Sequence, residues 1–98
     1  MARKHTFLNA EFTERWKKAY ELLQVSQQNG VDKVMGALLK QRPTPGMRVK
    51  PVEPDKYYYE ARINDADRLI YRTQGGLLYF IDIVPHDEIA KYSIGPSR

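Results

Sequence analysis

The chain has 98 residues, enough for one domain with a single hydrophobic core, so we expect residues 1–98 to form a single domain. It contains no cysteine, which excludes a disulfide framework and a cysteine-ligated zinc site, and no motif points to a cofactor. We expect neither a signal peptide nor a membrane span, and therefore a cytoplasmic location. Sixteen lysines and arginines against twelve acidic residues give a net charge of +4, a moderate bias toward anionic partners.

A first helix is predicted after a short strand at residues 4–8, with Asn9 as its N-cap. Its apolar residues recur at helical spacing and form one aromatic-rich stripe, made of Phe12, Trp16, Tyr20 and Leu23. We expect Trp16 to anchor the core rather than to bind a ligand.

A second helix is predicted after a tight corner at residues 25–26, with Ser26 as its N-cap, and it extends to about Lys40. Its apolar face consists of Val31, Val34, Met35, Leu38 and Leu39. The two helices are joined so closely that they should fold back as an antiparallel hairpin. Pro43 and Pro45 then end the helical region.

The next predicted strand covers residues 47–53. Arg48 and Lys50 should project from the same face of this strand, because alternate residues of a strand share a face. Pro51 lacks a backbone donor and therefore indicates an edge position or an early strand end.

Three further strands complete the predicted sheet. Residues 57–64 and 68–72 alternate like strands and flank a short polar turn. Gly75 and Gly76 suit a hairpin turn, and residues 77–84 are apolar enough to form the most buried strand, which Pro85 stops. The tail after Pro85 is predicted as a helical turn or an extended arm.

This order of elements predicts an α+β domain. An N-terminal strand and an antiparallel helix hairpin should pack on one face of a mainly antiparallel, twisted sheet of four to five strands. The residues expected to face the helices are Tyr59, Ala61, Ile63, Leu69 and Tyr71. The opposite sheet face should stay partly open.

Basic residues from three successive strands are expected on this open face, namely Arg48, Lys50, Arg62, Arg68 and Arg72. Lysine and arginine neutralise phosphates, and exposed bases stack on tyrosine or guanidinium planes, so together with Tyr58 and Tyr92 this surface would suit RNA. In the alternative interpretation, some of these arginines pair with Glu53, Glu60 or Asp82 and only solvate the sheet.

His86 follows the last predicted strand and is the residue best suited to acid or base chemistry near neutral pH. RNA supplies its own nucleophile, the 2′-hydroxyl, so a cleaving protein needs only to orient the chain, neutralise the phosphate and move protons. Arg62 and Lys50 are candidates for stabilising charge on the phosphate. A structural histidine bonded to Asp87 or to a backbone carbonyl is the alternative.

Five segments carry a resemblance to a known family through their order and spacing: residues 12–20, 46–50, 59–63, 67–71 and 84–88. Together they resemble the RelE/ParE toxin superfamily, particularly its RelE/HigB-like branch of type II toxin–antitoxin systems, over nearly the whole chain. The resemblance implies a RelE-like fold and a ribosome-dependent endoribonuclease (an mRNA interferase) that inhibits translation. It also implies a cognate antitoxin that blocks the basic face, with messenger RNA on the ribosome as the other partner.

The resemblance also assigns roles to residues. Arg48 and Lys50 match the basic pair of the strand after the helices and would bind RNA, and Arg68 joins them from its place on the same sheet face. The catalytic residues would be Arg62, His86 and Tyr92, the last as an approximate match to a C-terminal tyrosine.

Asp87 and Glu88 depart from the family pattern, because RelE-like toxins carry a further arginine after the last strand. These two carboxylates would repel phosphate nearby. A second hypothesis is therefore a non-catalytic, degenerate toxin-fold module that binds an antitoxin or RNA. A third is a ParE-like inhibitor of DNA gyrase, which uses the same fold on a different target.

Overall fold

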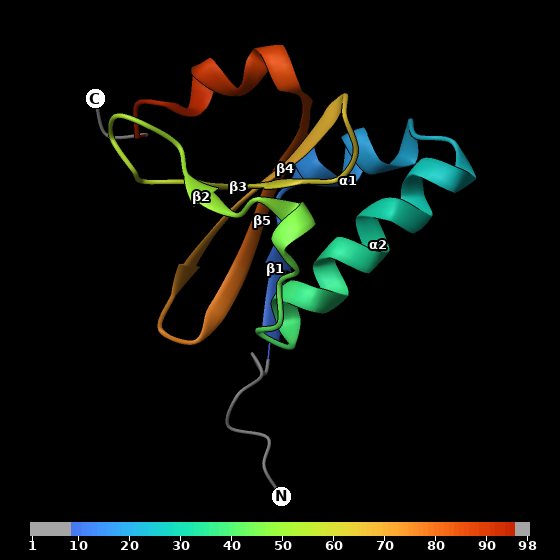
Figure 1. Ribbon diagram of the computed structural model, residues 1–98, viewed down its shortest axis with the longest axis horizontal. Helices are drawn as coiled ribbons and strands as arrows, with labels where there is room; N and C mark the ends of the chain where they lie inside the picture. Colours follow the sequence, from blue (N-terminus) through green and yellow to red (C-terminus); the bar gives the residue numbers. More distant parts are fainter. Residues whose placement is uncertain (1–8, 96–98) are drawn as a thin grey trace, which may run out of the picture.

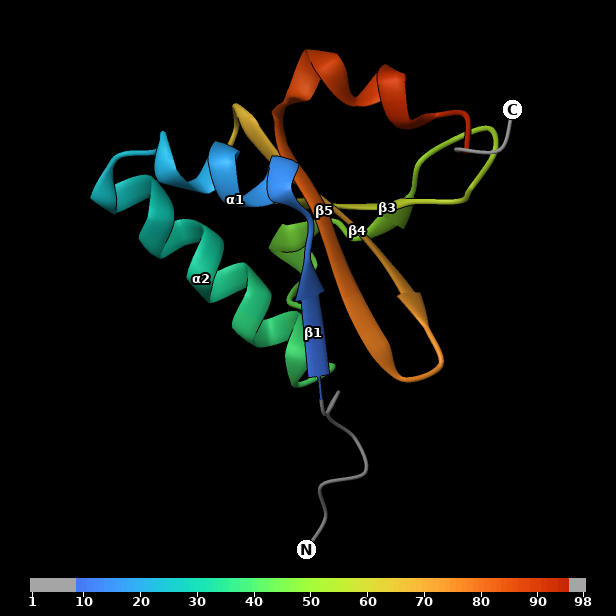
Figure 2. The ribbon, with the colours of Figure 1, turned by 180° about the vertical axis from the view of Figure 1, so that it is seen from behind.

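The described residues, 9–95 of a computed structural model, form one mixed sheet with the strand order β1-β5-β4-β3-β2. The strands are β1 (Asn9–Phe12), β2 (Lys50–Pro51), β3 (Tyr59–Arg62), β4 (Asp67–Gln74) and β5 (Leu77–Pro85). β1 runs parallel to β5, beside which it lies in Figure 2, and the other neighbours are antiparallel. The predicted fold class is confirmed, with a sheet that is mainly antiparallel.

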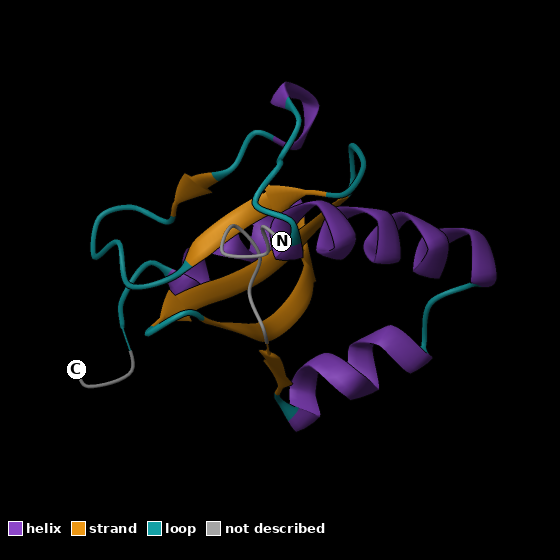
Figure 3. Cartoon of the chain, turned by 90° about the horizontal axis from the view of Figure 1, so that it is seen from below, coloured by secondary structure: helices purple, strands orange, loops and turns teal. Residues whose placement is uncertain are grey.

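Two α-helices and two short 3₁₀ helices accompany the sheet in this part of the chain. They are α1 (Glu14–Glu21), α2 (Val25–Leu39), η1 (Pro45–Met47) and η2 (His86–Tyr92). Both α-helices lie to one side of the sheet in Figure 3, and η2 crosses the top of Figure 1 in orange and red. No helix between residues 9 and 95 has the length and apolar character needed to cross a membrane.

The start of α1 differs from the prediction. Asn9 is the first residue of β1 rather than a helix cap, and the predicted strand at residues 4–8 lies outside the described residues. Thr13 is the N-cap, because its hydroxyl accepts a hydrogen bond from the Trp16 backbone N–H at 3.0 Å. The same hydroxyl donates to the Ile81 carbonyl at 2.6 Å, which fixes the beginning of α1 to β5.

The predicted cap of α2 is also wrong. The helix begins at Val25, so Ser26 lies inside it, and Gln24 is the N-cap. The Gln24 backbone N–H donates to Oε1 of Gln27 at 2.9 Å, which satisfies one donor at the helix start. The helix ends at Leu39, close to the predicted end.

The main core lies between the helices and the sheet, as predicted. Its buried residues are Trp16, Val31, Val34, Leu38, Met47, Ala61, Leu69, Tyr71, Leu78, Phe80 and Ile83. Trp16 is 6% exposed and stacks on Tyr20 with ring centroids 4.9 Å apart, which confirms it as a core anchor. Ala61, Leu69 and Tyr71 are buried on the helix side and Ile63 packs against them, as predicted, whereas Tyr59 is 37% exposed and lies outside this core.

The predicted strand at residues 47–53 shrinks to Lys50–Pro51. Pro45 opens the 3₁₀ turn η1, and the Arg48 backbone N–H bonds back to the Pro45 carbonyl at 3.1 Å. Arg48 adopts a left-handed conformation with φ of 45°, so Arg48 and Lys50 do not share a strand face. The edge position indicated by Pro51 is confirmed, since β2 ends the strand order.

The opposite face of the sheet carries a second, smaller core. Val52, Ile70, Val84 and Tyr92 are buried there, with Tyr58, Ile81 and Ile89 packed against them. The tail after β5 thus forms η2, which packs on this side of the sheet. We call this side the η2 face.

The β4–β5 hairpin has two local features, a tight turn and a bulge. Gly75 and Gly76 both have positive φ, as the predicted hairpin turn requires. Ile70 pairs with Asp82 but Tyr71 pairs with Phe80, so Ile81 is an extra residue that forms a bulge.

Candidate functional site

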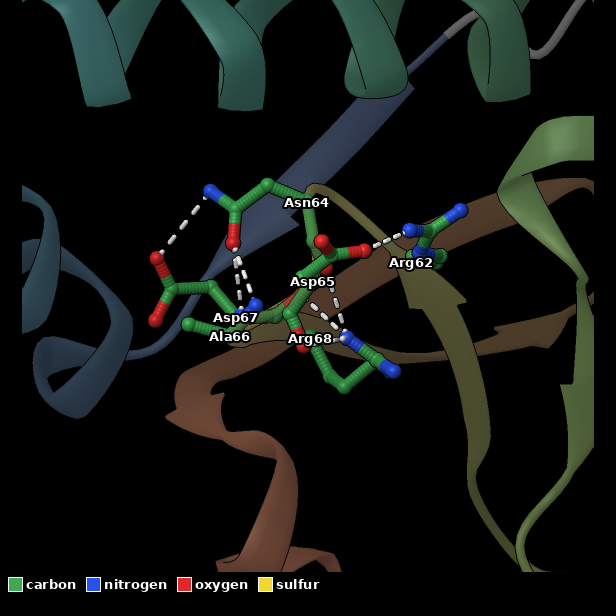
Figure 4. Close-up of polar contacts among 6 residues, drawn as sticks. All are labelled: Arg62, Asn64, Asp65, Ala66, Asp67 and Arg68. Atoms are coloured by element: carbon green, nitrogen blue, oxygen red, sulfur yellow. Dashed lines mark hydrogen bonds and ion pairs between the residues drawn. The ribbon is translucent and has the colours of Figure 1, made fainter.

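Three of the predicted site residues meet at the turn between β3 and β4. Arg62 and Arg68 are direct partners across these strands, and Arg68 also pairs with Val84 of β5. Two residues further along, the His86 backbone N–H donates to the Ala66 carbonyl in this turn at 2.7 Å. Figure 4 shows both arginines next to the residues of the turn.

The turn itself, residues 64–67, is built around Asn64. Its side-chain oxygen accepts hydrogen bonds from the backbone N–H groups of Ala66 and Asp67, each at 2.8 Å. Its amide nitrogen donates to Asp67 Oδ2 at 3.2 Å, and these contacts appear as dashed lines in Figure 4. An asparagine that bonds its own following backbone is a standard way to fix a tight turn.

Arg68 is committed to this turn. Its Nη1 atom donates to the carbonyl oxygens of Asn64 at 2.7 Å, Asp67 at 3.0 Å and Asp65 at 3.3 Å. Its Nε lies 3.9 Å from Oε1 of Glu60, and its side chain is only 13% exposed. The interpretation in which arginines pair within the sheet therefore describes Arg68 well.

Arg62 is held more loosely. Its guanidinium forms an ion pair with the Asp65 carboxylate, shown in Figure 4, and its side chain is 30% exposed whereas that of Asp65 is 93% exposed. An ion pair at such an exposed position contributes about 0–1 kcal/mol to stability. Exchange of Asp65 for a phosphate group would therefore cost little.

His86 is exposed at the first residue of η2. Among the described residues, no hydrogen bond or ion pair involves its imidazole, although its backbone is tied to the turn. Asp87 and Glu88 follow it in the first turn of η2, where both are exposed, and Glu88 pairs with Lys91 at 3.0 Å. The imidazole is thus available for proton transfer with an outside group.

The two remaining RNA-binding candidates separate. Lys50 is exposed beside Glu60 in the strand register and lines a hollow of about 420 Å³ between β2 and η2, together with Ile89 and Ala90. Arg48 is exposed but is not among the residues that line this hollow. The structure brings Lys50, and not Arg48, to the edge of the η2 face.

Tyr92 is buried, with 8% of its surface exposed. Its hydroxyl donates to Asp82 Oδ2 at 2.5 Å and accepts from Arg15 Nη1 at 3.2 Å. Its ring meets the Tyr58 ring edge-on at 5.2 Å. Burial, and then the hydrogen bond to Asp82, raise the pKa of Tyr92 to about 12, so the hydroxyl is protonated at neutral pH.

Sequence reasoning missed the polar cluster of Arg15, Asp82 and Tyr92. Asp82 is 4% exposed, and its Oδ1 accepts from the Ile83 backbone N–H at 2.8 Å. The sequence offered one signal for this cluster. Asp82 is a carboxylate inside the most apolar strand, and a buried charge requires partners. With η2 in place, the buried Tyr92 ring is not available to stack on a base.

The described part of the chain has the fold of the RelE-like toxins, which confirms the fold implied by the sequence resemblance. YafQ from Escherichia coli strain BL21(DE3) superposes with a TM-score of 0.71 and 20% identity over 82% of this chain and 94% of that chain. The E. coli DinJ–YafQ toxin–antitoxin complex gives 0.70 and 21% over 81% and 92%. The RelB–RelE antitoxin–toxin complex from Methanococcus jannaschii gives 0.65 and 12% over 84% and 96%. No protein-family model and no curated protein sequence matches this chain.

Proposed function

We propose that this chain is the toxin of a type II toxin–antitoxin system and that it inhibits translation by cutting messenger RNA on the ribosome, in the cytoplasm. One observation carries the proposal. An exposed imidazole without a side-chain partner among the described residues, that of His86, stands at the turn that also carries Arg62, on a RelE-like fold. This arrangement offers a proton-transfer group and a cation that only an exposed ion pair keeps from binding phosphate, both at one turn.

The reaction that these groups fit is attack by the RNA on itself. The 2′-oxygen bonds to the adjacent phosphorus while the bond from phosphorus to the 5′-oxygen of the next nucleotide breaks. The 2′-hydroxyl proton leaves to a base, and the 5′-oxygen gains a proton, which yields a 2′,3′-cyclic phosphate and a free 5′-hydroxyl. In our proposal His86 is the group that takes part in this proton transfer, and Arg62 neutralises the charge that develops on the phosphate.

Other residues act around this centre. Lys50 lies where it can hold a neighbouring phosphate at the edge of the η2 face. Arg48, two residues before it, is exposed and adds positive charge. Arg68 acts as a positioning residue, because it holds the turn to which His86 is bonded. Tyr92 acts in the same way at the other end of η2, through its hydrogen bond to Asp82.

An antitoxin is the second partner that we propose. The similar YafQ and RelE folds have been solved in DinJ–YafQ and RelB–RelE toxin–antitoxin complexes. The net charge of +4 would favour a partner segment that carries acidic residues.

The test is cleavage of a defined message in a purified translation system. Primer extension on the message maps the cuts, with and without ribosomes that translate it. We expect cuts only during translation, and their loss in both Arg62→Ala and His86→Ala. Arg42→Ala, an exposed arginine after α2, is the matched control and should cut normally. Undiminished cutting by both site variants would remove the assignment.

A second candidate function is a non-catalytic module that binds an antitoxin or RNA. The observation that favours it is the pair of exposed carboxylates, Asp87 and Glu88, directly after His86. Salt-sensitive RNA binding by a protein that leaves translated messages intact would support this candidate. Replacement of both residues by Asn and Gln would then restore or increase cutting if their charge is the obstacle.

A further inference from the structure

A second hollow lies on the sheet away from the β3–β4 turn. It has a volume of about 330 Å³ and is lined by Tyr57, Tyr58, Arg72, Gln74, Tyr79 and Ile81. This volume falls at the low end of the range for small-molecule sites, which suits a ligand of a few rings at most. Three tyrosines and one arginine give it an unusual concentration of flat, π-rich surfaces.

The flat groups in this hollow are already held in place. The Arg72 guanidinium carbon lies 3.9 Å from the centre of the Tyr57 ring, a cation–π contact. Arg72 also donates from Nη1 to the Tyr57 carbonyl at 3.2 Å and from Nη2 to Gln74 Oε1 at 3.1 Å. The Tyr58 ring stands edge-on to Tyr57 at 4.8 Å and to Tyr92 at 5.2 Å, so η2 supports the wall of the hollow.

The hollow lies on the same sheet face as Arg68, the residue that holds the turn of the candidate cleavage centre. Arg68, Ile70 and Arg72 alternate along β4, and Ile70 belongs to the core under η2. Tyr79 pairs with Arg72 across the hairpin and therefore points to the same side. Arg72 lies four positions after Arg68, a distance of about 13 Å at the usual strand rise, which a few nucleotides of single-stranded RNA can span.

We propose that the hollow between Tyr57, Arg72 and Tyr79 binds an unpaired nucleobase of the RNA strand, outside the nucleotide pair that is cut. This inference rests on the proposed function for the presence of RNA, and it adds a site and a ligand class to it. A base can stack on tyrosine and guanidinium planes whatever its identity, while the Arg72 charge attracts the adjoining phosphate. The phenol groups of Tyr57 and Tyr79, which make no hydrogen bond to another described residue, can bond the base edge.

The experiment separates base binding from phosphate binding. Fluorescence anisotropy measures the affinity of His86→Ala protein for two labelled probes at low salt: an oligoadenylate RNA and an abasic ribose-phosphate strand of the same length. We expect the base-containing RNA to bind more tightly. Tyr79→Ala should weaken RNA binding by about 5- to 150-fold, the usual effect of removing one stacking ring. It should leave the abasic probe unaffected, and Tyr79→Phe, which keeps the ring and loses only the hydroxyl, should retain most of the RNA affinity.

A second variant makes the result independent of how well Tyr79→Ala folds. Arg72→Lys keeps the charge but loses the guanidinium plane, so it should weaken RNA binding without changing the salt dependence. Equal affinity for the two probes, or RNA affinity that survives both variants, would overturn the nucleobase site. If translated messages are cut and these variants bind normally, only this inference fails. If base-dependent binding is present but no message is cut, only the proposed cleavage fails.

Discussion

Replacement of Tyr92 by phenylalanine tests how η2 is held to the sheet. The change removes one oxygen atom and keeps the ring in its edge-on contact with Tyr58. It deletes the hydrogen bond of 2.5 Å to Asp82, a carboxylate that is 4% exposed. A hydrogen bond to a charged group contributes about 1.5–3 kcal/mol, and a buried carboxylate that loses a donor pays its desolvation cost as well.

The expected loss is therefore about 2 kcal/mol in the free energy of unfolding. Arg15 compensates little, because its side chain is 65% exposed and its Nη1 lies 3.9 Å from Asp82 Oδ2. For a chain of this size the loss corresponds to a decrease in Tm of about 10 °C. Urea and thermal denaturation, followed by circular dichroism, measure both values.

Tyr59→Phe is the matched control, because Tyr59 is 37% exposed and its hydroxyl makes no hydrogen bond to another described residue. It should stay within about 0.5 kcal/mol of the parent. A Tyr92→Phe variant that is as stable as this control would refute the reasoning. The folded Tyr92→Phe protein should also keep its cleavage rate within a few-fold, whereas loss of cleavage without loss of structure would assign the hydroxyl to catalysis.

Three other predictions follow from the same contacts. Arg68→Ala removes three hydrogen bonds to turn carbonyls and should cost about 2–3 kcal/mol in urea denaturation, whereas Arg62→Ala should cost less than about 1 kcal/mol. Burial raises the pKa of Tyr71, like that of Tyr92, to about 12, so between pH 10 and 12 the unfolded chain has released protons that the folded chain retains. The contribution of these two tyrosines to stability should be constant below about pH 10 and then fall by up to about 2.7 kcal/mol per tyrosine toward pH 12, with a smaller fall in Tyr71→Phe. Gly76→Ala forces a side chain to φ of 83° in otherwise open space and should cost about 1–2 kcal/mol, measured as a lower Tm.

The parts of the fold that the sequence predicted well are those set by local periodicity. Alternation along β3 and β4 assigned Ala61, Leu69 and Tyr71 to the helix side, and each is at most 5% exposed. The hairpin at Gly75 and Gly76 was equally predictable, because few other residues adopt two successive positive φ angles. Such signals need no knowledge of distant contacts.

The helix starts were not predictable in the same way. Asn9 and Ser26 are both favoured cap residues, so local preference indicated them. The first fails because Phe12 stacks on Phe80 of β5, at 5.3 Å between ring centres, and pairing with β5 keeps the chain extended as far as Phe12. The decisive contact joins residues far apart in the sequence, and no local rule contains it.

The same distinction between local signals and distant contacts applies to the candidate site. The sequence picked out Arg62 and His86 separately, and the structure places Arg62 next to the turn to which the His86 backbone is bonded. The cluster of Arg15, Asp82 and Tyr92 joins three distant segments, so single-sequence patterns could not reveal it.

These distant contacts also explain why His86 has a fixed place while its side chain stays unpartnered among the described residues. At one end of η2, the His86 backbone is bonded to a turn that Arg68 holds through three carbonyl oxygens. At the other end, Tyr92 is bonded to a buried carboxylate. One exposed turn and one buried hydrogen bond thus position an exposed imidazole, while Arg62 keeps only a weak, exposed ion pair. This combination suits the proposed cleavage, because a proton-transfer site requires its supports to be rigid and its reacting groups to be free.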